Sequence, residues 1–225
     1  ILRMDADATL RKNSHEKLFD SFLKGDYDIL IGTQMVAKGL NFPNVTLVGV
    51  VNADQMLYAD DYKSFERAFS LLTQVVGRSG RGDTKGRAII QTHTPESHVI
   101  SLAALQDYDA FYESEIALRQ AMLYPPFADL CIAGFAAEQR NSAQKGAEEF
   151  LKLLASTAKT KFPQLPMRVL GPTLEAVAKI NNKYRYRLMI KCRSGKDFRS
   201  LMQEVLASFG TLPGHKNTGV YIDFI

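Results

Sequence analysis

Two arginines in a glycine-rich segment are the residues best suited to phosphate chemistry. A predicted helix ends where they lie, in the string Gln74-Val-Val-Gly77-Arg78-Ser-Gly80-Arg81-Gly82. A positioned guanidinium can stabilise the negative charge on the γ-phosphate oxygens during phosphoryl transfer. Glycines let the backbone approach a ligand or a neighbouring domain closely. The spacing alone fits a glycine helix cap followed by solvated arginines equally well, so both interpretations stay open.

A second polar segment follows a predicted buried strand. Its sequence is Ile31-Gly32-Thr33-Gln34-Met35-Val36-Ala37-Lys38-Gly39-Leu40-Asn41-Phe42. In open α/β sheets, ligands bind beyond the carboxyl ends of the strands. A loop of this composition at that place could hold phosphates or a nucleic-acid backbone. An ordinary loop between a strand and a helix is the alternative.

Alternating strands and helices must position both segments. Short apolar runs predict strands at 1–4, 28–31, 45–51 and 87–92, and apolar residues at helical spacing predict helices at 14–23 and 63–76. Such alternation with short connections indicates an α/β fold with a parallel sheet. We therefore expect residues 1–95 to form one domain.

Residues 96–127 predict a helical connector, and a different kind of domain follows it. The helical stretch runs over 95–122 and is followed by Tyr124-Pro-Pro-Phe127, which ends it because consecutive prolines cannot continue a helix. Its apolar residues could dock on either neighbour. Residues 128–225 predict the order β-α-β-β-α-β of a small α+β domain, the split βαβ or ferredoxin-like arrangement. The expected strands are 130–137, 167–170, 184–192 and 219–225, and the expected helices are 142–160 and 196–209.

Charge is unevenly divided between the two halves of the 225 residues. Residues 1–120 contain 13 Lys and Arg against 16 Asp and Glu, whereas residues 121–225 contain 15 against 8. A basic half suggests a polyanionic partner. Within it, the predicted strand 184–192 alternates: Tyr184, Tyr186, Leu188 and Ile190 share one face, and Arg185, Arg187, Met189 and Lys191 share the other. With Arg193, these cations could bind phosphates, or they could be a solvated sheet face.

Other features of the sequence exclude several classes of protein. The two cysteines, Cys131 and Cys192, are far apart and form neither a disulfide framework nor a metal site, which favours a reducing compartment, the cytoplasm. No apolar run reaches the roughly 20 residues that cross a membrane, and there is no secretory signal. The chain begins with Ile-Leu-Arg-Met-Asp, which is typical of the end of a strand. We expect it to be a fragment of a longer protein.

The two polar segments together resemble motifs V and VI of superfamily 2 helicases. A narrower resemblance, to the PriA family of bacterial replication-restart (primosomal) DNA helicases, rests on strings along the chain. These are Arg3-Met-Asp-Ala-Asp7, Asp28-Ile-Leu-Ile-Gly-Thr-Gln-Met, Phe42-Pro-Asn-Val-Thr-Leu-Val, Asn52-Ala-Asp54, Leu72-Thr-Gln-Val and Tyr124-Pro-Pro-Phe127. The resemblance covers essentially the whole chain and is densest in 1–95, where it implies a second, RecA-like helicase lobe.

The resemblance implies catalytic and nucleotide-binding residues. Arg78 and Arg81 match arginines that reach ATP bound on the other motor lobe, and Gln74 matches a polar residue near the γ-phosphate. Gly39 and Asn41, at motif V positions, are expected near the nucleotide, together with Gly77 of the glycine-rich bend. Many relatives have Asp in place of Asn41, so a role there that needs a carboxylate is in doubt.

Nucleic-acid contacts follow from the same resemblance. Thr33, Gln34 and Lys38 match the part of motif V that faces the nucleic-acid backbone. The last domain of the family contacts branched DNA and the acidic C-terminal tail of single-stranded DNA-binding protein. The cations Arg185, Arg187, Lys191 and Arg193 could therefore serve either partner.

The sequence lacks the part of a helicase that holds Mg²⁺-ATP. It has no Gly-x-x-x-x-Gly-Lys-Ser/Thr loop and no acidic Asp-Glu-x-His-like motif. ATP and Mg²⁺ are expected mainly on the missing first lobe. The resemblance places the zinc-binding cysteines of the family upstream of this chain. The isolated chain is thus predicted to be inactive.

As part of the longer protein, it is expected to act in a 3′ to 5′ ATP-dependent DNA helicase that restarts stalled or repaired replication forks with other primosome proteins. A different superfamily 2 motor (a fork remodeller or an RNA helicase) and a non-catalytic nucleic-acid-binding module are the alternatives.

Overall fold

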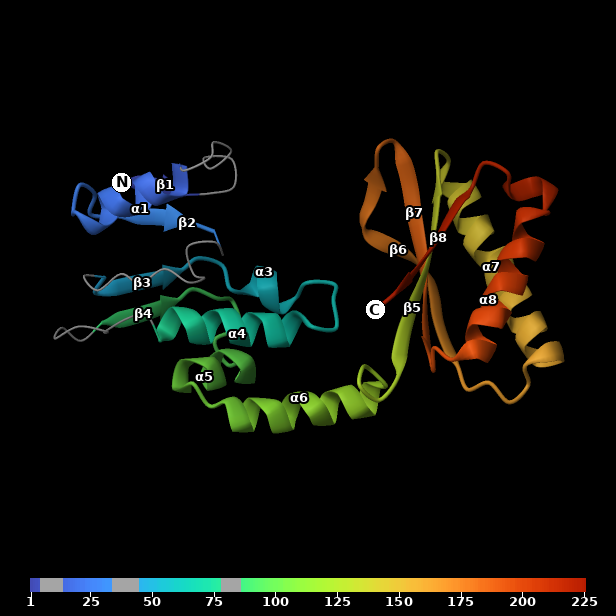
Figure 1. Cartoon of the computed structure of the whole chain (residues 1–225), viewed down its shortest axis with the longest axis horizontal. Coiled ribbons are helices and arrows are strands. Elements are labelled where there is room, and N and C mark those ends of the chain that lie inside the picture. The colour runs from blue at the N-terminus through green and yellow to red at the C-terminus, as the bar shows by residue number, and fades with distance from the viewer. Residues whose placement is uncertain (5–13, 34–44, 78–85) are drawn as a thin grey trace. The chain divides into compact units, whose positions relative to one another are not determined.

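The computed structural model describes residues 1–4, 14–33, 45–77 and 86–225, and these divide into two compact units. Unit 1 comprises residues 1–116 and unit 2 comprises residues 117–225. Figure 1 shows unit 1 in blue and green and the sheet and helices of unit 2 in yellow to red.

Unit 1 contains parallel strands connected by helices. Strand β1 (Leu2–Met4) pairs in parallel with β2 (Leu30–Gly32), and β3 (Leu47–Val50) pairs in parallel with β4 (Arg87–Ile90). Helix α1 (Ser14–Leu23) lies between β1 and β2 in the chain, and α3 (Asp54–Leu57) and α4 (Ser64–Val76) lie between β3 and β4. The predicted parallel pairing is present. Within the described residues, however, the strands form two ladders of two strands and not a single sheet.

The core of unit 1 lies where α4 packs against the helices that follow β4. Phe69 and Leu72 of α4 are buried together with Val99 and Ala103 of α5 (His98–Leu105). The ring of Phe69 stacks on that of Phe111 in α6 (Tyr108–Met122), with 4.0 Å between their centroids. The first part of the predicted connector therefore belongs to the core of unit 1.

The helical stretch predicted over 95–122 is present, but it is divided into two helices, α5 and α6. Helix α5 ends at Leu105, because the next residue, Gln106, has a left-handed φ of 56°. The backbone N–H groups of Gln106 and Asp107 donate to the carbonyls of Ala103 and Leu102, which satisfies the end of the helix. No glycine or proline marks this break, so the apolar spacing alone did not reveal it.

Unit 2 has the predicted order β-α-β-β-α-β. The elements are β5 (Asp129–Ala137), α7 (Arg140–Lys161), β6 (Arg168–Ile180), β7 (Lys183–Cys192), α8 (Lys196–Gly210) and β8 (Gly219–Phe224). The four strands form one sheet in the order β6-β7-β5-β8, and every neighbouring pair is antiparallel.

Strand β6 is longer than the sequence predicts. It was expected to end at Leu170, but it continues to Ile180, with an irregularity between Leu170 and Thr173. Gly171 has a φ of 105°, which only glycine adopts without strain, and this lets the strand bulge and resume pairing with β7. Asn181 and Asn182, with φ of 48° and 62°, then form the tight turn into β7.

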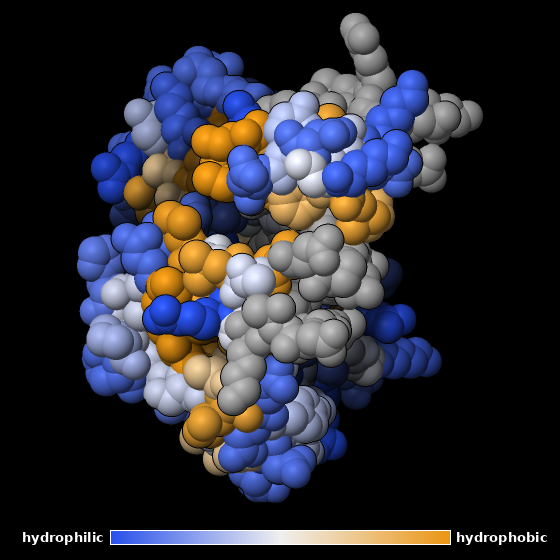
Figure 2. Space-filling model, turned by 90° about the vertical axis from the view of Figure 1, so that its left-hand side faces the viewer, coloured by the Kyte–Doolittle hydropathy of each residue, from blue (hydrophilic) through white to orange (hydrophobic). Residues whose placement is uncertain are grey.

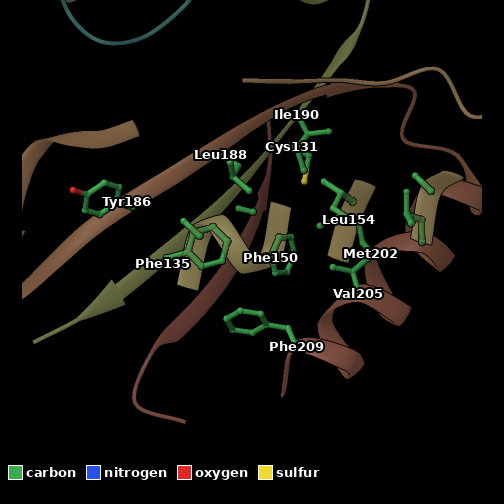
Figure 3. Close-up of a cluster of buried hydrophobic side chains, with 14 of the residues drawn as sticks. Cys131, Phe135, Phe150, Leu154, Tyr186, Leu188, Ile190, Met202, Val205 and Phe209 are labelled. Atoms are coloured by element: carbon green, nitrogen blue, oxygen red, sulfur yellow. The ribbon is translucent and has the colours of Figure 1, made fainter. Parts of the chain in front are cut away.

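Helices α7 and α8 cover one face of this sheet (Figure 1). The alternation predicted for β7 is confirmed, because Tyr186, Leu188 and Ile190 are buried in the core under the helices. Figure 3 shows the rings of Phe135 and Phe150 beside one another in this core. Their centroids are 5.2 Å apart and the rings meet edge to face. Burying each such side chain stabilises the fold by about 1.5–3 kcal/mol.

Candidate nucleic-acid interface

Most of the residues assigned to the motor by their motifs lie outside the described residues. These are Arg78, Arg81, Gln34, Lys38, Gly39 and Asn41. Thr33 lies within the described residues. It follows the carboxyl end of β2 and its side chain is exposed, as a contact with the nucleic-acid backbone would require. The role of each of these residues stays a prediction.

Gln74 and Gly77 are described, and they occupy the last turn of α4. The amide of Gln74 donates to the hydroxyl of Ser70, with 3.2 Å between Nε2 and Oγ, and its side chain is half-buried. Gly77 ends the helix with its N–H donating to the carbonyl of Thr73. A side chain at Gly77 would lie 3.0 Å from the amide of Gln106. The turn between α5 and α6 therefore packs closely on the point where the arginine-rich segment begins.

Asp54 joins the carboxyl ends of the parallel strands β3 and β4. Its Oδ1 accepts hydrogen bonds from the hydroxyls of Thr92 (2.9 Å) and Thr94 (3.0 Å), and its Oδ2 accepts one from the backbone N–H of His93 (2.9 Å). The bond from His93, followed by those from the two threonines, lowers the pKa of Asp54 against the opposing effect of burial. This carboxylate connects α3 to the loop after β4. Sequence reasoning noted Asp54 only as part of a family string.

In unit 2, the face of the sheet opposite the helices contains a group of cations that we call the cationic face: Arg168, Arg185, Arg187 and Lys191. Arg168 of β6 lies directly opposite Lys191 of β7, so both side chains belong to the same face. Arg168 is exposed. Sequence reasoning missed it. The sequence did contain a signal for it. Met167 and Val169 are apolar, so alternation along the strand would place Arg168 between them on the opposite, outward face.

Arg185 of β7 is held in place by two partners on other strands of the sheet, Glu175 on the neighbouring β6 and Tyr221 on β8. Its Nη2 donates to the hydroxyl of Tyr221 (3.1 Å) and lies 3.3 Å from Oε1 of Glu175. The hydroxyl of Tyr221 in turn donates to Glu175 over 2.7 Å. Burial, and then the bond to Glu175, raise the pKa of Tyr221, so the hydroxyl keeps its proton at neutral pH. Three strands thus share one hydrogen-bonded group at this end of the cationic face.

Lys191, by contrast, is almost fully buried, with 5% of its surface exposed. Its Nζ lies 3.9 Å from the centre of the Tyr124 ring and donates to the carbonyl of Met122. Burial, and then the charge of Arg168, lower the pKa of Lys191. In this structure Lys191 binds the segment that precedes β5, so among the four cations predicted to bind DNA in unit 2 it is the least accessible.

Arg193 is exposed and lines an open pocket at the end of β7. The pocket holds about 400 Å³ and is lined by Pro126, Phe127, Ala128, Asp129, Arg193, Ser194 and Gly195. Asp129 accepts hydrogen bonds from the backbone N–H (2.8 Å) and the hydroxyl (2.9 Å) of Ser194. These two bonds lower the pKa of Asp129, and the charge of Arg193 lowers it further. Burial has the opposite effect but is outweighed.

Comparisons with known proteins show what this arrangement is similar to. The family model of the helicase conserved C-terminal domain matches residues 3–83, and that of the primosomal protein N C-terminal domain matches residues 120–224. The replication restart protein PriA of Bacillus subtilis is 41% identical over 225 residues, which are 99% of this chain and 27% of that protein. The chain belongs to the PriA family.

Other members of the PriA family match in the same way. The replication restart protein PriA of Synechocystis is 38% identical over 84% of this chain and 22% of that protein. The chain thus spans about a quarter of the length of the curated relatives it matches, 27% and 22% of these two. Among solved structures, a de novo designed protein matches 44% of this chain and 96% of its own at 10% identity, and its TM-score of 0.32 is too low to support an argument.

The described part of this PriA-family chain shows two further features. No three His, Cys, Asp or Glu side chains gather there as a metal site would require. None of its helices is both long and apolar enough to reach across a bilayer.

Proposed function

We propose that the chain is the C-terminal part of a 3′ to 5′ ATP-dependent DNA helicase that binds branched DNA at stalled or repaired forks and starts primosome assembly. The observation that carries this proposal is membership of the PriA family along both units. We infer that residues 1–95 are the second RecA-like lobe, residues 96–127 a connector and residues 128–225 a ferredoxin-like DNA- and partner-binding domain.

In the proposed motor, unit 1 completes an ATP site that another lobe begins. ATP, held with Mg²⁺ mainly by that lobe, supplies the γ-phosphate. Arg78 and Arg81 would stabilise the charge on its oxygens, and Gln74 would lie near the same phosphate. The side chain of Gln106 comes close to Gly77, which places the turn between α5 and α6 beside the last described residue before the arginine-rich segment. Thr33, Gln34 and Lys38 would contact the DNA backbone beyond β2.

Exposed apolar side chains also fit a lobe that works inside a larger protein. On the strands of unit 1 and beside them, Ile31, Leu47, Val51 and Ile89 are each more than half exposed. Figure 2 shows hydrophobic residues gathered at the surface on the side of the molecule where unit 1 lies. Parallel strands are normally covered on both faces. These side chains are therefore suited to packing against further parts of a longer protein.

In unit 2, we propose that Arg193, Arg187 and Arg168 contact DNA phosphates, with Arg185 beside them. Lys191 is left out of these phosphate contacts, because its buried ammonium already binds the Tyr124 ring and the Met122 carbonyl. A cationic surface of this kind binds phosphates without reading sequence, and its affinity falls as salt rises. The acidic C-terminal tail of single-stranded DNA-binding protein, and other primosome proteins, are the protein partners that we propose on the same grounds of charge.

The motor role is tested by ATP hydrolysis. We expect the 225-residue chain to show no turnover, and a longer protein that contains the first lobe to hydrolyse ATP when DNA is added. Arg81→Ala in the longer protein should reduce kcat by at least about 10³-fold, the size expected of an arginine that stabilises a transferring phosphoryl group. Arg87→Ala, which removes an exposed arginine at the start of β4 in the same unit, is the control. Turnover by the isolated chain would contradict the proposal.

The DNA-binding role is tested by a salt titration of the chain on forked DNA. Each phosphate contact should add about 0.7–0.9 to the slope of log affinity against log salt. Arg193→Ala should therefore make this negative slope less steep by nearly one unit. Lys145→Ala removes an exposed cation from α7, on the helical side of the sheet, and should leave the slope unchanged. An equal effect of both variants would show that net charge alone is responsible.

A further inference from the structure

An aromatic ring covers a glycine of the sheet at the end of the cationic face where Arg185 lies. Tyr221 of β8 and Gly134 of β5 are directly opposed in the sheet. A side chain at Gly134 would overlap the ring of Tyr221, which shows that the ring covers the glycine. Although Tyr221 belongs to an edge strand, its ring therefore lies over a central strand. Tyr221 remains 38% exposed.

The ring is held in one orientation. Its hydroxyl donates to Glu175 of β6 (2.7 Å) and accepts from Arg185 of β7 (3.1 Å). Contacts with Gly134 beneath the ring complete the support. A side chain that is already immobile loses little conformational entropy when a ligand binds to it, so this ring is prepared for a planar ligand.

Cations on the same face indicate what kind of planar ligand would bind. Gly134 is opposed by Arg187 on its other side, and Arg187 is opposed by Thr173 of β6. A row across the sheet therefore places the Tyr221 ring one strand away from Arg187. An aromatic surface for a base next to a guanidinium for a phosphate is the arrangement by which open sheets bind single-stranded nucleic acid.

We propose that Tyr221 is a stacking platform for a base of single-stranded DNA on the open face of the unit 2 sheet. The proposal rests on the proposed DNA-binding function of this unit and names the nucleic acid that the site takes. In a duplex the faces of the bases are already stacked on one another, so only an unpaired strand can offer a base to this ring. Glu175 is paired with Arg185 at the hydroxyl end of the ring, and Arg187, on the strand next to Gly134, offers a guanidinium for the DNA backbone.

The test compares two oligonucleotides of equal phosphate number, a ten-nucleotide dT strand and an abasic strand, bound by the 225-residue chain. The wild-type chain should prefer dT by about tenfold, the contribution of one stacked base. Tyr221→Ala should abolish this preference and leave abasic binding unchanged. Tyr221→Phe, which retains the ring, should retain most of the preference. Tyr27→Ala is the matched control, since Tyr27 is 37% exposed in unit 1.

Each outcome separates this inference from the proposed function. If the wild type binds both strands equally well, stacking is wrong and phosphate binding stands. If it binds neither, the DNA-binding function itself fails. An equal loss on both strands in Tyr221→Ala, or a loss in Tyr221→Phe as large as that in Tyr221→Ala, would also overturn the proposal.

A second measurement needs no variant. An oligonucleotide with 5-iododeoxyuridine, cross-linked by light to the wild-type chain, should attach to the peptide that contains Tyr221. Attachment only to other peptides would overturn the inference.

Discussion

The ammonium of Lys191 lies 3.9 Å from the centre of the Tyr124 ring and donates to the carbonyl of Met122. This interaction ties the segment before β5 to the end of β7. A buried cation needs such partners, because an unpaired charge away from water is strongly unfavourable. The same side chain that alternation assigned to a DNA-binding surface thus has a structural role within unit 2.

Replacing Lys191 with Met tests that role. Lys191→Met keeps the length of the side chain but removes the interaction with the Tyr124 ring and leaves the Met122 carbonyl without its donor. We expect the free energy of unfolding to fall by about 1–3 kcal/mol, measured by urea denaturation followed by circular dichroism. Lys183→Met, at an exposed position of the same strand, should change it by less than about 0.5 kcal/mol. Equal stability of the two variants would contradict this account.

Gly171 should not tolerate a side chain. Its φ of 105° is unfavourable for any other residue, and a Cβ there would lie 2.8 Å from the backbone carbonyl oxygen of Arg187. Gly171→Ala should therefore lower the free energy of unfolding by about 1–3 kcal/mol. Gly210→Ala is the control, because nothing lies within 4 Å of a side chain at that position. Thermal unfolding of the two variants compares them, and an unchanged midpoint for Gly171→Ala would disprove the strain.

The carboxylate of Asp54 should make unit 1 more stable at neutral than at acidic pH. Its hydrogen bonds, first of all that from His93, lower its pKa below the ordinary 3.8. A lowered folded-state pKa means that the stabilisation is complete above the ordinary pKa and is lost as pH falls through the folded value. Asp54→Asn should therefore be less stable than the wild type at pH 7, and this difference should shrink between about pH 5 and pH 2.

The control for this prediction is Asp26→Asn, which makes the same charge change at an exposed position. It removes a carboxylate without removing the hydrogen bonds that Asp54 makes to the loop after β4. A difference between wild type and Asp54→Asn that stays constant from pH 7 to pH 2 would show that the carboxylate contributes no charge-dependent stability.

The two cysteines should be unreactive in the folded chain. Burial raises the pKa of Cys131 to about 12 and that of Cys192 to about 11. Because the thiolate is the reactive form, labelling at pH 8 should be at least about 100-fold slower than in urea. Measuring thiol labelling with and without urea checks this. Rapid labelling of either cysteine in the native chain would show that its part of the core opens.

Local patterns in the sequence determined the order of strands and helices and the two faces of β7. Side chains alternate along any strand, so Leu188 and Arg187 must face opposite sides whatever the rest of the chain does. Residue type and spacing also made phosphate chemistry one interpretation of the arginines after Gly77, whereas the role of Gln74 came from the family resemblance. These inferences needed no knowledge of distant residues.

Tertiary structure alone decided which cations are accessible and where the rings lie. Lys191 finds its acceptor 69 residues away in sequence, and Tyr221 covers a glycine on another strand. Such contacts depend on the register between strands and on which segments pack together, and no local period encodes either. For the same reason the break at Gln106 and the extension of β6 past Gly171 became apparent only in the folded chain.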